Sequence, residues 1–317
     1  MTGSGVSGSG VSGSGGVAVA AEVLGRRARR EEPLGPRTTF RVGGRAALCV
    51  EVVGESDLTE AASAVAASGV AVLVVGRGSN LLVSDRGFGG LAVGLGEGFA
   101  AIEVDGGLVR AGGSVALPVL ARRTAACGLG GMEWAVGVPG SIGGAVRMNA
   151  GGHGSDMAAT LLRARLVDLR WGRDEVVAAE DLELGYRRSA VTPSQVVVWA
   201  ELGLPAGDTG AASRKMGEIV RWRREHQPGG QNAGSVFTNP PGDAAGGLVE
   251  RAGCKGLRRG SAAVSTKHAN FIQVDPDGSA DDVRWVMGVV QARVQEVTGV
   301  WLEPEVQLIG FDKETLS

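Results

Sequence analysis

Two glycine-rich stretches constrain the fold of this chain more than any other feature of its sequence. The first, residues 76–80, directly follows Val70–Val75, an aliphatic run that predicts a buried strand. The second spans residues 137–152 and has six glycines in sixteen positions. Glycine loses more conformational entropy on folding than other residues, so this density is costly unless something must lie against the backbone. The stretches therefore predict loops that admit a ligand.

The first loop has the composition of a phosphate site. A diphosphate needs backbone N–H groups at close range, and side chains beyond Cβ obstruct that approach. Gly76 and Gly78 leave the backbone accessible, while Ser79 and Asn80 add a hydroxyl and an amide. Arg77 either adds charge or points to solvent, and the alternative for the whole loop is an ordinary tight turn. Two such loops some sixty residues apart suit one long ligand, such as a dinucleotide.

The bulk composition excludes several classes of function. The formal charge is -2 and the pI is near 6.0, so no basic field favours nucleic acid. The three cysteines are widely spaced without a C-x-x-C, which argues against a disulfide framework or zinc site and for a reducing compartment. The three histidines form no close pair of metal ligands, so no metal is expected. No apolar run is long enough to cross a membrane and no secretion signal is evident, so the cytoplasm is expected.

The N-terminus is a Gly/Ser-rich repeat. Residues 1–16 offer no apolar face, and residues 1–20 are therefore predicted to be a disordered tail. Residues 3–8 match the G-x-G-x-x-G dinucleotide fingerprint, but that fingerprint works only between a strand and a helix. The match carries no weight here.

The remaining chain reads as alternating strands and helices. Asp57 is expected to cap a helix over residues 57–68, and Ser279 one over residues 279–297. Residues 205–210 are the best linker candidate. Further helices are expected over 114–127 and 213–225, and strands over 91–95, 101–104, 108–111, 161–169, 175–178, 196–202 and 300–309. The pattern predicts an α+β fold in two or three lobes.

Seven short motifs, taken together, carry a resemblance to a known family. They occupy residues 38–44, 76–85, 137–151, 185–189, 233–240, 268–271 and 302–306. In this order, over roughly residues 35–311, the chain resembles the UDP-N-acetylenolpyruvoylglucosamine reductase (MurB) family. Tyr186 is the sole tyrosine, so the chain looks like the second type of this family, which lacks the tyrosine loop.

The resemblance implies a cytoplasmic flavoenzyme of peptidoglycan synthesis, and hence of cell wall biogenesis, cell shape and cell division. In this family NADPH reduces non-covalently bound FAD, and the enolpyruvyl ether of UDP-N-acetylglucosamine is then reduced to UDP-N-acetylmuramate. The implied architecture is a vanillyl-alcohol-oxidase (PCMH) type FAD-binding region over residues 21–204, divided into two subdomains near residue 70. A smaller α+β substrate-binding domain over residues 212–311 and a tail over 312–317 follow. A monomer is expected, with a nucleotide-sugar substrate and neither nucleic acid nor membrane as a partner.

The resemblance also implies three catalytic residues. Hydride addition to the enolpyruvyl group pushes charge onto the attached carboxylate, which needs preorganised partners. Arg187 matches the family arginine in this role, and its planar fork suits a carboxylate. Glu305 matches the glutamate that shares this stabilisation, acting protonated or hydrogen-bonded. Ser235 matches the serine that protonates C2. Without the resemblance, the three residues read as a surface arginine, a strand carboxylate and a turn serine.

The remaining site residues follow from the same motifs. Tyr186, Asn239 and His268 are candidates for contacts to the substrate or NADPH, with a structural role as the alternative for His268. The cofactor-binding candidates are Gly76, Gly78, Ser79, Asn80, Leu81, Pro139, Gly140, Ser141, Gly143, Gly144, Asn149, Ala150 and Gly151.

The chain departs from the family pattern at three positions. Arg37 and Arg45 stand where the family has other residues, and Thr238 replaces a common lysine, which puts a phosphate contact from that side chain in doubt. A separate basic cluster favours a solvated helix face over a phosphate site: Arg214, Lys215, Arg221, Arg223 and Arg224.

Two alternatives compete with this interpretation. One is a different FAD oxidoreductase of the same cofactor-binding class, which oxidises an alcohol or lactone. The other is a nucleotide-sugar binding module without catalysis, against which the joint presence of Arg187, Ser235 and Glu305 argues. A visible flavin spectrum and its bleaching by substrate separate these classes.

Overall fold

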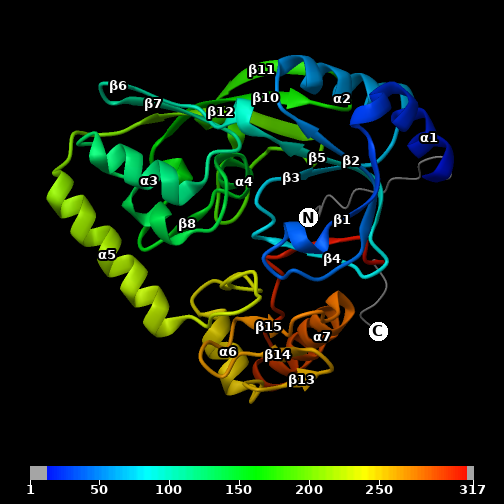
Figure 1. Ribbon diagram of the computed structural model, residues 1–317. Helices are drawn as coiled ribbons and strands as arrows, with labels where there is room; N and C mark the ends of the chain where they lie inside the picture. Colours follow the sequence, from blue (N-terminus) through cyan, green and yellow to red (C-terminus); the bar gives the residue numbers. More distant parts are fainter. Residues whose placement is uncertain (1–12, 313–317) are drawn as a thin grey trace.

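The computed structural model describes residues 13–312 and has two parts, a larger one built on two sheets and a smaller C-terminal lobe (Figure 1). Most of the predicted tail, residues 1–12, and the predicted C-terminal tail, residues 313–317, lie outside the described residues. The helices and strands mix as predicted for an α+β fold.

The first sheet has the order β1-β2-β5-β3. Strand β1 (Arg29–Pro33) pairs antiparallel with β2 (Arg45–Val52), whereas β5 (Phe88–Leu95) runs parallel to both β2 and β3 (Val72–Val75). Helices α1 (Gly13–Leu24) and α2 (Glu55–Ser68) bury their apolar sides in one cluster with this sheet. Gly69 ends α2 in the left-handed conformation, as its sequence predicts.

The second sheet is antiparallel throughout, in the order β11-β10-β12-β7-β6. Its strands are β6 (Ile102–Asp105), β7 (Leu108–Gly112), β10 (Leu161–Asp168), β11 (Arg173–Ala178) and β12 (Gln195–Gly203). Three helices join its core: α3 (Leu117–Ala126), α4 (Ile142–Met148) and α5 (Thr209–His226). The short hairpin of β8 (Gly151–Gly152) and β9 (Ser155–Asp156) follows α4.

The C-terminal lobe has a small sheet and two helices. Strands β13 (Arg258–Arg259), β14 (Ala262–Val264) and β15 (Ile272–Val274) form the sheet, and helices α6 (Ala245–Arg251) and α7 (Ala280–Thr298) pack with it. The chain then returns to the larger part, where β16 (Gln307–Ile309) pairs in parallel with β4 (Leu81–Val83). The two parts are thus joined twice.

The prediction of disorder up to residue 20 is wrong for its described portion. Helix α1 begins at Gly13, and the side chains of Ala20 and Leu24 are buried against the first sheet. At Gly16 the fit to α2 is so close that an added Cβ would lie 2.9 Å from the carbonyl oxygen of Ser68. The short apolar run from Val17 to Leu24 therefore supplies the packing face that the Gly/Ser composition concealed.

The sheets and cores of the structure divide the chain at other positions than two of the predicted domain boundaries. The first sheet is completed only by β5, which ends at Leu95, so the division of the larger part lies near residue 96 and not near residue 70. Helix α5 packs on the core of the second sheet through Ile219, so the C-terminal lobe begins after His226 and not at residue 212.

Two element boundaries differ from expectation, and a third element begins as expected. Helix α2 starts at Glu55 with Gly54 as its cap, because the Asp57 carboxylate instead accepts from the backbone N–H of Val53. The predicted final strand over 300–309 is reduced to β16. Ser279 caps α7 by accepting from the N–H of Asp282, as predicted.

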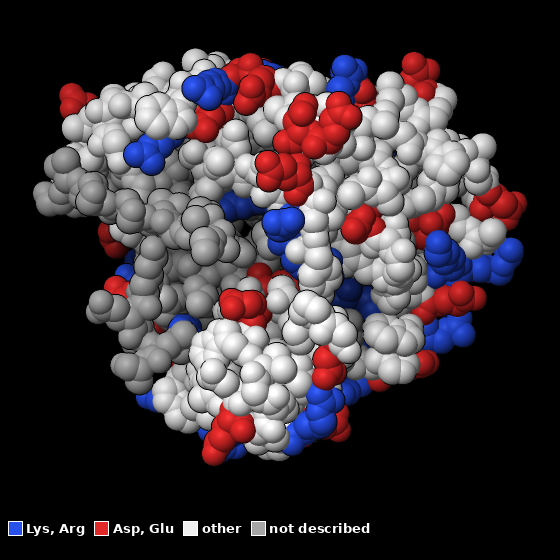
Figure 2. Space-filling model, turned by 180° about the vertical axis from the view of Figure 1, so that it is seen from behind, with Lys and Arg blue, Asp and Glu red and all other residues white. Residues whose placement is uncertain are grey.

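The surface carries charges of both signs without a large region of either sign on the face seen in Figure 2. Among the described residues, no helix has the length and apolarity needed to cross a membrane. Residues 13–312 also contain no group of three or more His, Cys, Asp or Glu arranged to hold a metal.

Candidate active site

The first glycine loop follows β3 and is shaped by close backbone contacts. Gly78 has φ +61°, and a Cβ added there would lie 2.0 Å from the carbonyl oxygen of Arg37, so only glycine fits. The backbone N–H groups of Gly78, Ser79 and Asn80 donate to none of residues 13–312. The loop therefore presents a set of free donors, as a diphosphate site requires.

The second loop is fixed to the end of β7. Ser141 is buried, and the N–H groups of Ile142 and Gly143 donate to the carbonyls of Val115 and Gly113 at 2.9 Å each. The two loops touch, since a Cβ at Gly76 would lie 2.7 Å from Oγ of Ser141. Residues some sixty positions apart thus share one surface, as predicted.

A cavity of about 330 Å³ opens where the loops meet the start of β12. Its volume lies at the lower end of the range of ligand pockets, about 300–1,000 Å³. From the first loop it takes Gly76 and Arg77, and from the second Ser141, Gly143 and Gly144. The rest of its lining is Val74, Val75, Leu95, Gly113, Ser114, Arg147, Val191, Gln195, Val196 and Val197.

Asn149, a predicted cofactor contact, makes three hydrogen bonds within the protein through its side chain. It is buried with φ +40°, and its Nδ2 donates to Oδ2 of Asp156 at 3.2 Å and to the carbonyl of Gly185 at 3.0 Å. Its Oδ1 accepts from the N–H of Ala158. The side-chain amide is thus committed to joining the β8–β9 hairpin to the segment that carries Arg187.

Arg187 and Glu305, which are 118 positions apart in the sequence, form an ion pair. Nε of Arg187 donates to Oε1 of Glu305 at 2.8 Å, and Nη2 donates to the carbonyl of Gly151 at 3.0 Å. Arg187 has φ +56°, an uncommon backbone conformation for a residue other than glycine. Asn80 of the first loop binds the backbone of Glu305, with Nδ2 2.9 Å from its carbonyl oxygen. The pair therefore sits where the glycine loop meets the returning C-terminal segment.

The Glu305 carboxyl is largely buried, with 16% of its side chain exposed. Burial raises the pKa of this carboxyl above its ordinary value, and the neighbouring Arg187 guanidinium opposes the rise. Because burial has the larger effect, the group gains a proton more readily than an exposed glutamate does. This agrees with the expected protonated or hydrogen-bonded role.

Ser235 lies beside Glu305 through its own chain segment. The carbonyl of its neighbour Val236 accepts from the N–H of Glu305 at 2.8 Å. Asn270 holds this segment in place, since its side-chain amide donates to and accepts from the backbone of Phe237 at 2.8 and 3.0 Å. The Ser235 hydroxyl makes no hydrogen bond with the described residues, so it is available to a ligand.

The three candidates for substrate contacts lie around this centre in different ways. The Tyr186 ring lies under the Arg187 guanidinium at 5.1 Å, and its hydroxyl accepts from the N–H of Asn239 at 3.5 Å. The Asn239 side chain accepts from the N–H of Ala245 and so caps the start of α6. Nδ1 of His268 accepts from the backbone N–H of Asn270, which favours the structural alternative for this histidine.

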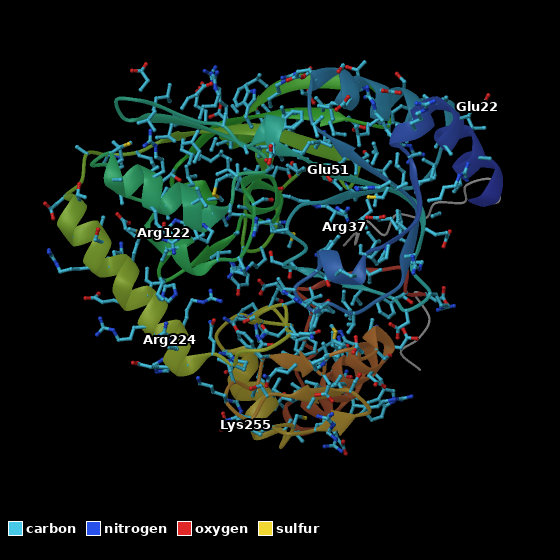
Figure 3. The ribbon with its side chains drawn as sticks, viewed as in Figure 1. Glu22, Arg37, Glu51, Arg122, Arg224 and Lys255 are labelled. Carbon is cyan, nitrogen blue, oxygen red and sulfur yellow. The ribbon has the colours of Figure 1, made fainter. Side chains whose placement is uncertain are left out.

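The basic cluster on α5 divides into two kinds of side chain. Arg223 is half-buried, and burial lowers the pKa of its guanidinium, while the other four members are exposed. Lys215 forms an ion pair with Glu133 at 3.4 Å. Figure 3 shows Arg224 at the lower end of α5, where its carbonyl accepts from Lys267 of the C-terminal lobe at 2.7 Å. The basic cluster on α5 therefore forms a solvent-exposed helix face, as predicted, except at Arg223.

Sequence reasoning missed the residues that hold the site rather than line it. Asn270 stands inside a recognised motif, yet nothing in the motif indicates its two hydrogen bonds to Phe237. Arg147 was passed over within the second loop motif although it lines the cavity. The sequence feature that could have indicated Arg147 as a site residue is that it is the single arginine in a glycine-rich helix.

Comparison with protein families finds two matches. The description "FAD binding domain" applies to residues 46–173, and "UDP-N-acetylenolpyruvoylglucosamine reductase, C-terminal domain" applies to residues 226–309. The free donors of the first loop and the adjoining cavity fit a dinucleotide, and FAD is the cofactor. The second match starts at residue 226, where α5 ends.

Comparison with known proteins gives similar sequences along almost the whole chain. The chain is 42% identical over 290 residues to UDP-N-acetylenolpyruvoylglucosamine reductase 2 of Symbiobacterium thermophilum, covering 90% of this chain and 93% of that protein. It is 40% identical over 285 residues to UDP-N-acetylenolpyruvoylglucosamine reductase of Rubrobacter xylanophilus, with 89% and 95% covered.

Among solved structures, the chain is similar to the crystal structure of UDP-N-acetylenolpyruvylglucosamine reductase (MurB) from Thermus caldophilus. The TM-score is 0.78 at 34% identity, covering 89% of this chain and 99% of that one. The α+β fold with a PCMH-type FAD domain and a C-terminal domain is thereby confirmed.

Proposed function

Because the chain belongs to the UDP-N-acetylenolpyruvoylglucosamine reductase family, we propose that it reduces the enolpyruvyl ether of UDP-N-acetylglucosamine to UDP-N-acetylmuramate, with NADPH as reductant. The observation that carries this proposal is the Arg187–Glu305 ion pair, with 2.8 Å between Nε and Oε1, beside the first glycine loop. The pair joins a cation, a proton-binding carboxyl and the neighbouring Ser235 hydroxyl at the junction of the two parts.

When bound, FAD would supply the two-electron redox chemistry that couples NADPH to the enolpyruvyl group. The open N–H groups of residues 78–80 and the adjoining cavity hold this cofactor. The proposed role of the other side chains is to bind the substrate carboxylate and to complete the reduction with a proton.

Arg187 binds the substrate carboxylate. Its Nε and Nη2 are occupied by Glu305 and Gly151, while Nη1 donates to none of the described residues. This leaves a fixed donor for the charge that develops when C3 is reduced. A donor that is already oriented needs no reorganisation during the reaction, which is the main source of this kind of stabilisation.

Glu305 and Ser235 are the residues that donate to the substrate, Glu305 through a hydrogen bond to the enolate and Ser235 through the proton that C2 receives. Burial raises the pKa of the Glu305 carboxyl, so it takes up a proton more readily than an exposed glutamate does; when protonated, it donates a hydrogen bond to the developing enolate. The free Ser235 hydroxyl delivers the proton to C2, with its surroundings providing the activation that a neutral hydroxyl needs. General acid catalysis of this kind contributes about 10²–10⁴-fold to the rate.

Anaerobic half-reactions test the proposal. NADPH should bleach the visible flavin absorbance of the holoenzyme, and enolpyruvyl-UDP-N-acetylglucosamine should then restore it. UDP-N-acetylglucosamine, which lacks the enolpyruvyl group, is the matched control and should not. Mass spectrometry of the product should show the gain of two hydrogens. Bleaching by NADPH with no recovery on adding the substrate would assign the chain to another flavoenzyme reaction.

The wider setting is proposed on the same basis. The product is a precursor of peptidoglycan, so we place the enzyme in cell wall biosynthesis, in the cytoplasm, where NADPH is available. We expect a monomer, which sedimentation of the holoenzyme tests directly.

A further inference from the structure

Arg147 lines the cofactor cavity and has no partner among the described residues. It lies in the last turn of α4 and is partly buried. Its guanidinium makes no hydrogen bond or ion pair with residues 13–312, and burial alone lowers the pKa of the group. A desolvated cation without an anion is unfavourable, so its place in the cavity needs an explanation.

The cavity has no anion of its own to meet this cation. Its lining contains two arginines and neither aspartate nor glutamate among the described residues. The other arginine, Arg77, is exposed at the rim. A ligand that enters the cavity therefore has to supply the negative charge for Arg147.

The backbone of α4 provides only a small part of the positive end that a diphosphate would otherwise use. Its first two N–H groups, those of Ile142 and Gly143, already donate to the carbonyls of Val115 and Gly113. The N–H of Gly144, which lines the cavity, donates to none of the described residues, and the other free backbone donors come from the first loop. On the α4 side, one backbone N–H is therefore free, and the only formal positive charge among the described lining residues on this side is that of Arg147.

Arg147 is held so that it faces this space. Ser189 Oγ donates to the Arg147 carbonyl at 2.7 Å, and the left-handed Asn149 ends the helix immediately afterwards. Three positions earlier, on the same side of the helix, a Cβ at Gly144 would meet only Oγ of Ser141, at 3.7 Å. The path from Arg147 along α4 towards the loops is therefore open.

We propose that Arg147 is a cofactor-binding residue that pairs with the diphosphate of FAD, opposite the backbone donors of residues 78–80. The planar guanidinium matches two phosphate oxygens at once, and such charged hydrogen bonds are among the strongest in proteins. The first loop then contributes backbone N–H groups, and the α4 side contributes the Gly144 N–H together with a side-chain cation.

Release of FAD from the diluted holoenzyme, followed by flavin fluorescence, tests the proposal without any turnover. Arg147→Gln should raise the dissociation constant of FAD about 10- to 100-fold, as expected for loss of a hydrogen bond to a charged group. Arg147→Lys, which keeps the charge, should recover part of the loss. Arg221→Gln removes an equal charge from an exposed position on α5 and should leave FAD retention as in the wild type.

Displacement by fragments identifies the contact. ADP should displace FAD from the wild type and do so less effectively from Arg147→Gln, while adenosine should compete equally against both. A dissociation constant within threefold of the wild type in a folded Arg147→Gln protein would overturn the proposal. Equal weakening of ADP and adenosine would also overturn it, because that outcome places Arg147 on the adenine. If the glutamine variant does not fold, the same comparison is made between the wild type and Arg147→Lys. The pairing would then be refuted if ADP displaced FAD equally well from both proteins and if the affinity for FAD did not change with salt concentration.

Discussion

At the scale of residues, three asparagine amides hold the backbone of the reacting groups. Asn80 binds the carbonyl of Glu305, Asn149 that of Gly185 near Arg187, and Asn270 the backbone of Phe237 near Ser235. These asparagines can contribute to catalysis without contacting the substrate. Geometry held within a fraction of an ångström is what such supporting groups contribute to catalysis.

Ser235 allows the sharpest test at this scale. Ser235→Ala should leave reduction of the flavin by NADPH almost intact, because that step needs no proton for the substrate. Reoxidation by the substrate should slow by about 10²–10⁴-fold, the range of general acid catalysis. Ser235→Cys should recover part of this loss, and Ser63→Ala on the exposed side of α2 should change neither step. Rapid-mixing absorbance measures both, and equal slowing of the two steps would show that Ser235 serves the fold or the flavin.

The motifs predicted which side chains gather, but not how they are held. Arg187 and Glu305 were identified by resemblance, and the structure brings them together at 2.8 Å. Their physical chemistry alone favours a surface arginine and a solvated carboxylate. The support from Asn80 was not predictable, because its partner lies 225 positions away and no local pattern connects the two.

At the scale of elements, α1 is the segment that differs most from what its composition predicts, because a helix replaces the expected disorder. Its packing rests on few side chains, and Leu24 is 2% exposed. Leu24→Ala should lower the free energy of unfolding by about 2–4 kcal/mol, the usual cost of removing a buried leucine side chain. Val23→Ala, at an adjacent position that is 37% exposed, should cost much less. Chemical denaturation of the holoenzyme compares the two, and equal losses would show that α1 does not pack as described.

Elements with strong end signals were predicted best. Helix α7 has Ser279 as its cap, an apolar stripe and a left-handed Gly299 after its last turn, so its limits were nearly right. Helix α5 was predicted from its sequence, but it was placed in the C-terminal lobe instead of with the second sheet. An amphipathic pattern does not indicate which hydrophobic core a helix will join. That choice depends on Ile219 meeting side chains from distant strands.

At the scale of the whole molecule, Asp85 connects the two parts. Its carboxylate accepts from Oγ of Ser279 at 2.5 Å and from the N–H groups of Ala280 and Asp281 at 3.0 and 3.2 Å. A residue after β4 therefore caps a helix of the other lobe. Phe40, Val42 and Leu82 of the larger part also enter the core of that lobe.

Removing this cap should loosen the joint. Asp85→Ala should lower the free energy of unfolding by about 1–2 kcal/mol, as expected for loss of a helix cap. Glu296→Ala removes a carboxylate from an exposed position on the same helix and should change it little. Chemical denaturation followed by tryptophan fluorescence provides the measurement. An Asp85→Ala protein as stable as the Glu296→Ala protein would contradict a stabilising role for the joint.

The pairing of β4 with β16 has a consequence for the order in which the protein is made. Strand β4 carries the fully buried Leu82 and follows the FAD loop directly, yet its partner strand is more than two hundred positions downstream. Domains generally fold as they leave the ribosome, N-terminal first. Here the nascent cofactor region keeps an apolar strand uncovered until β16 has been synthesised. Flavin loading is therefore expected to follow translation of β16 rather than to accompany synthesis of the first half of the chain.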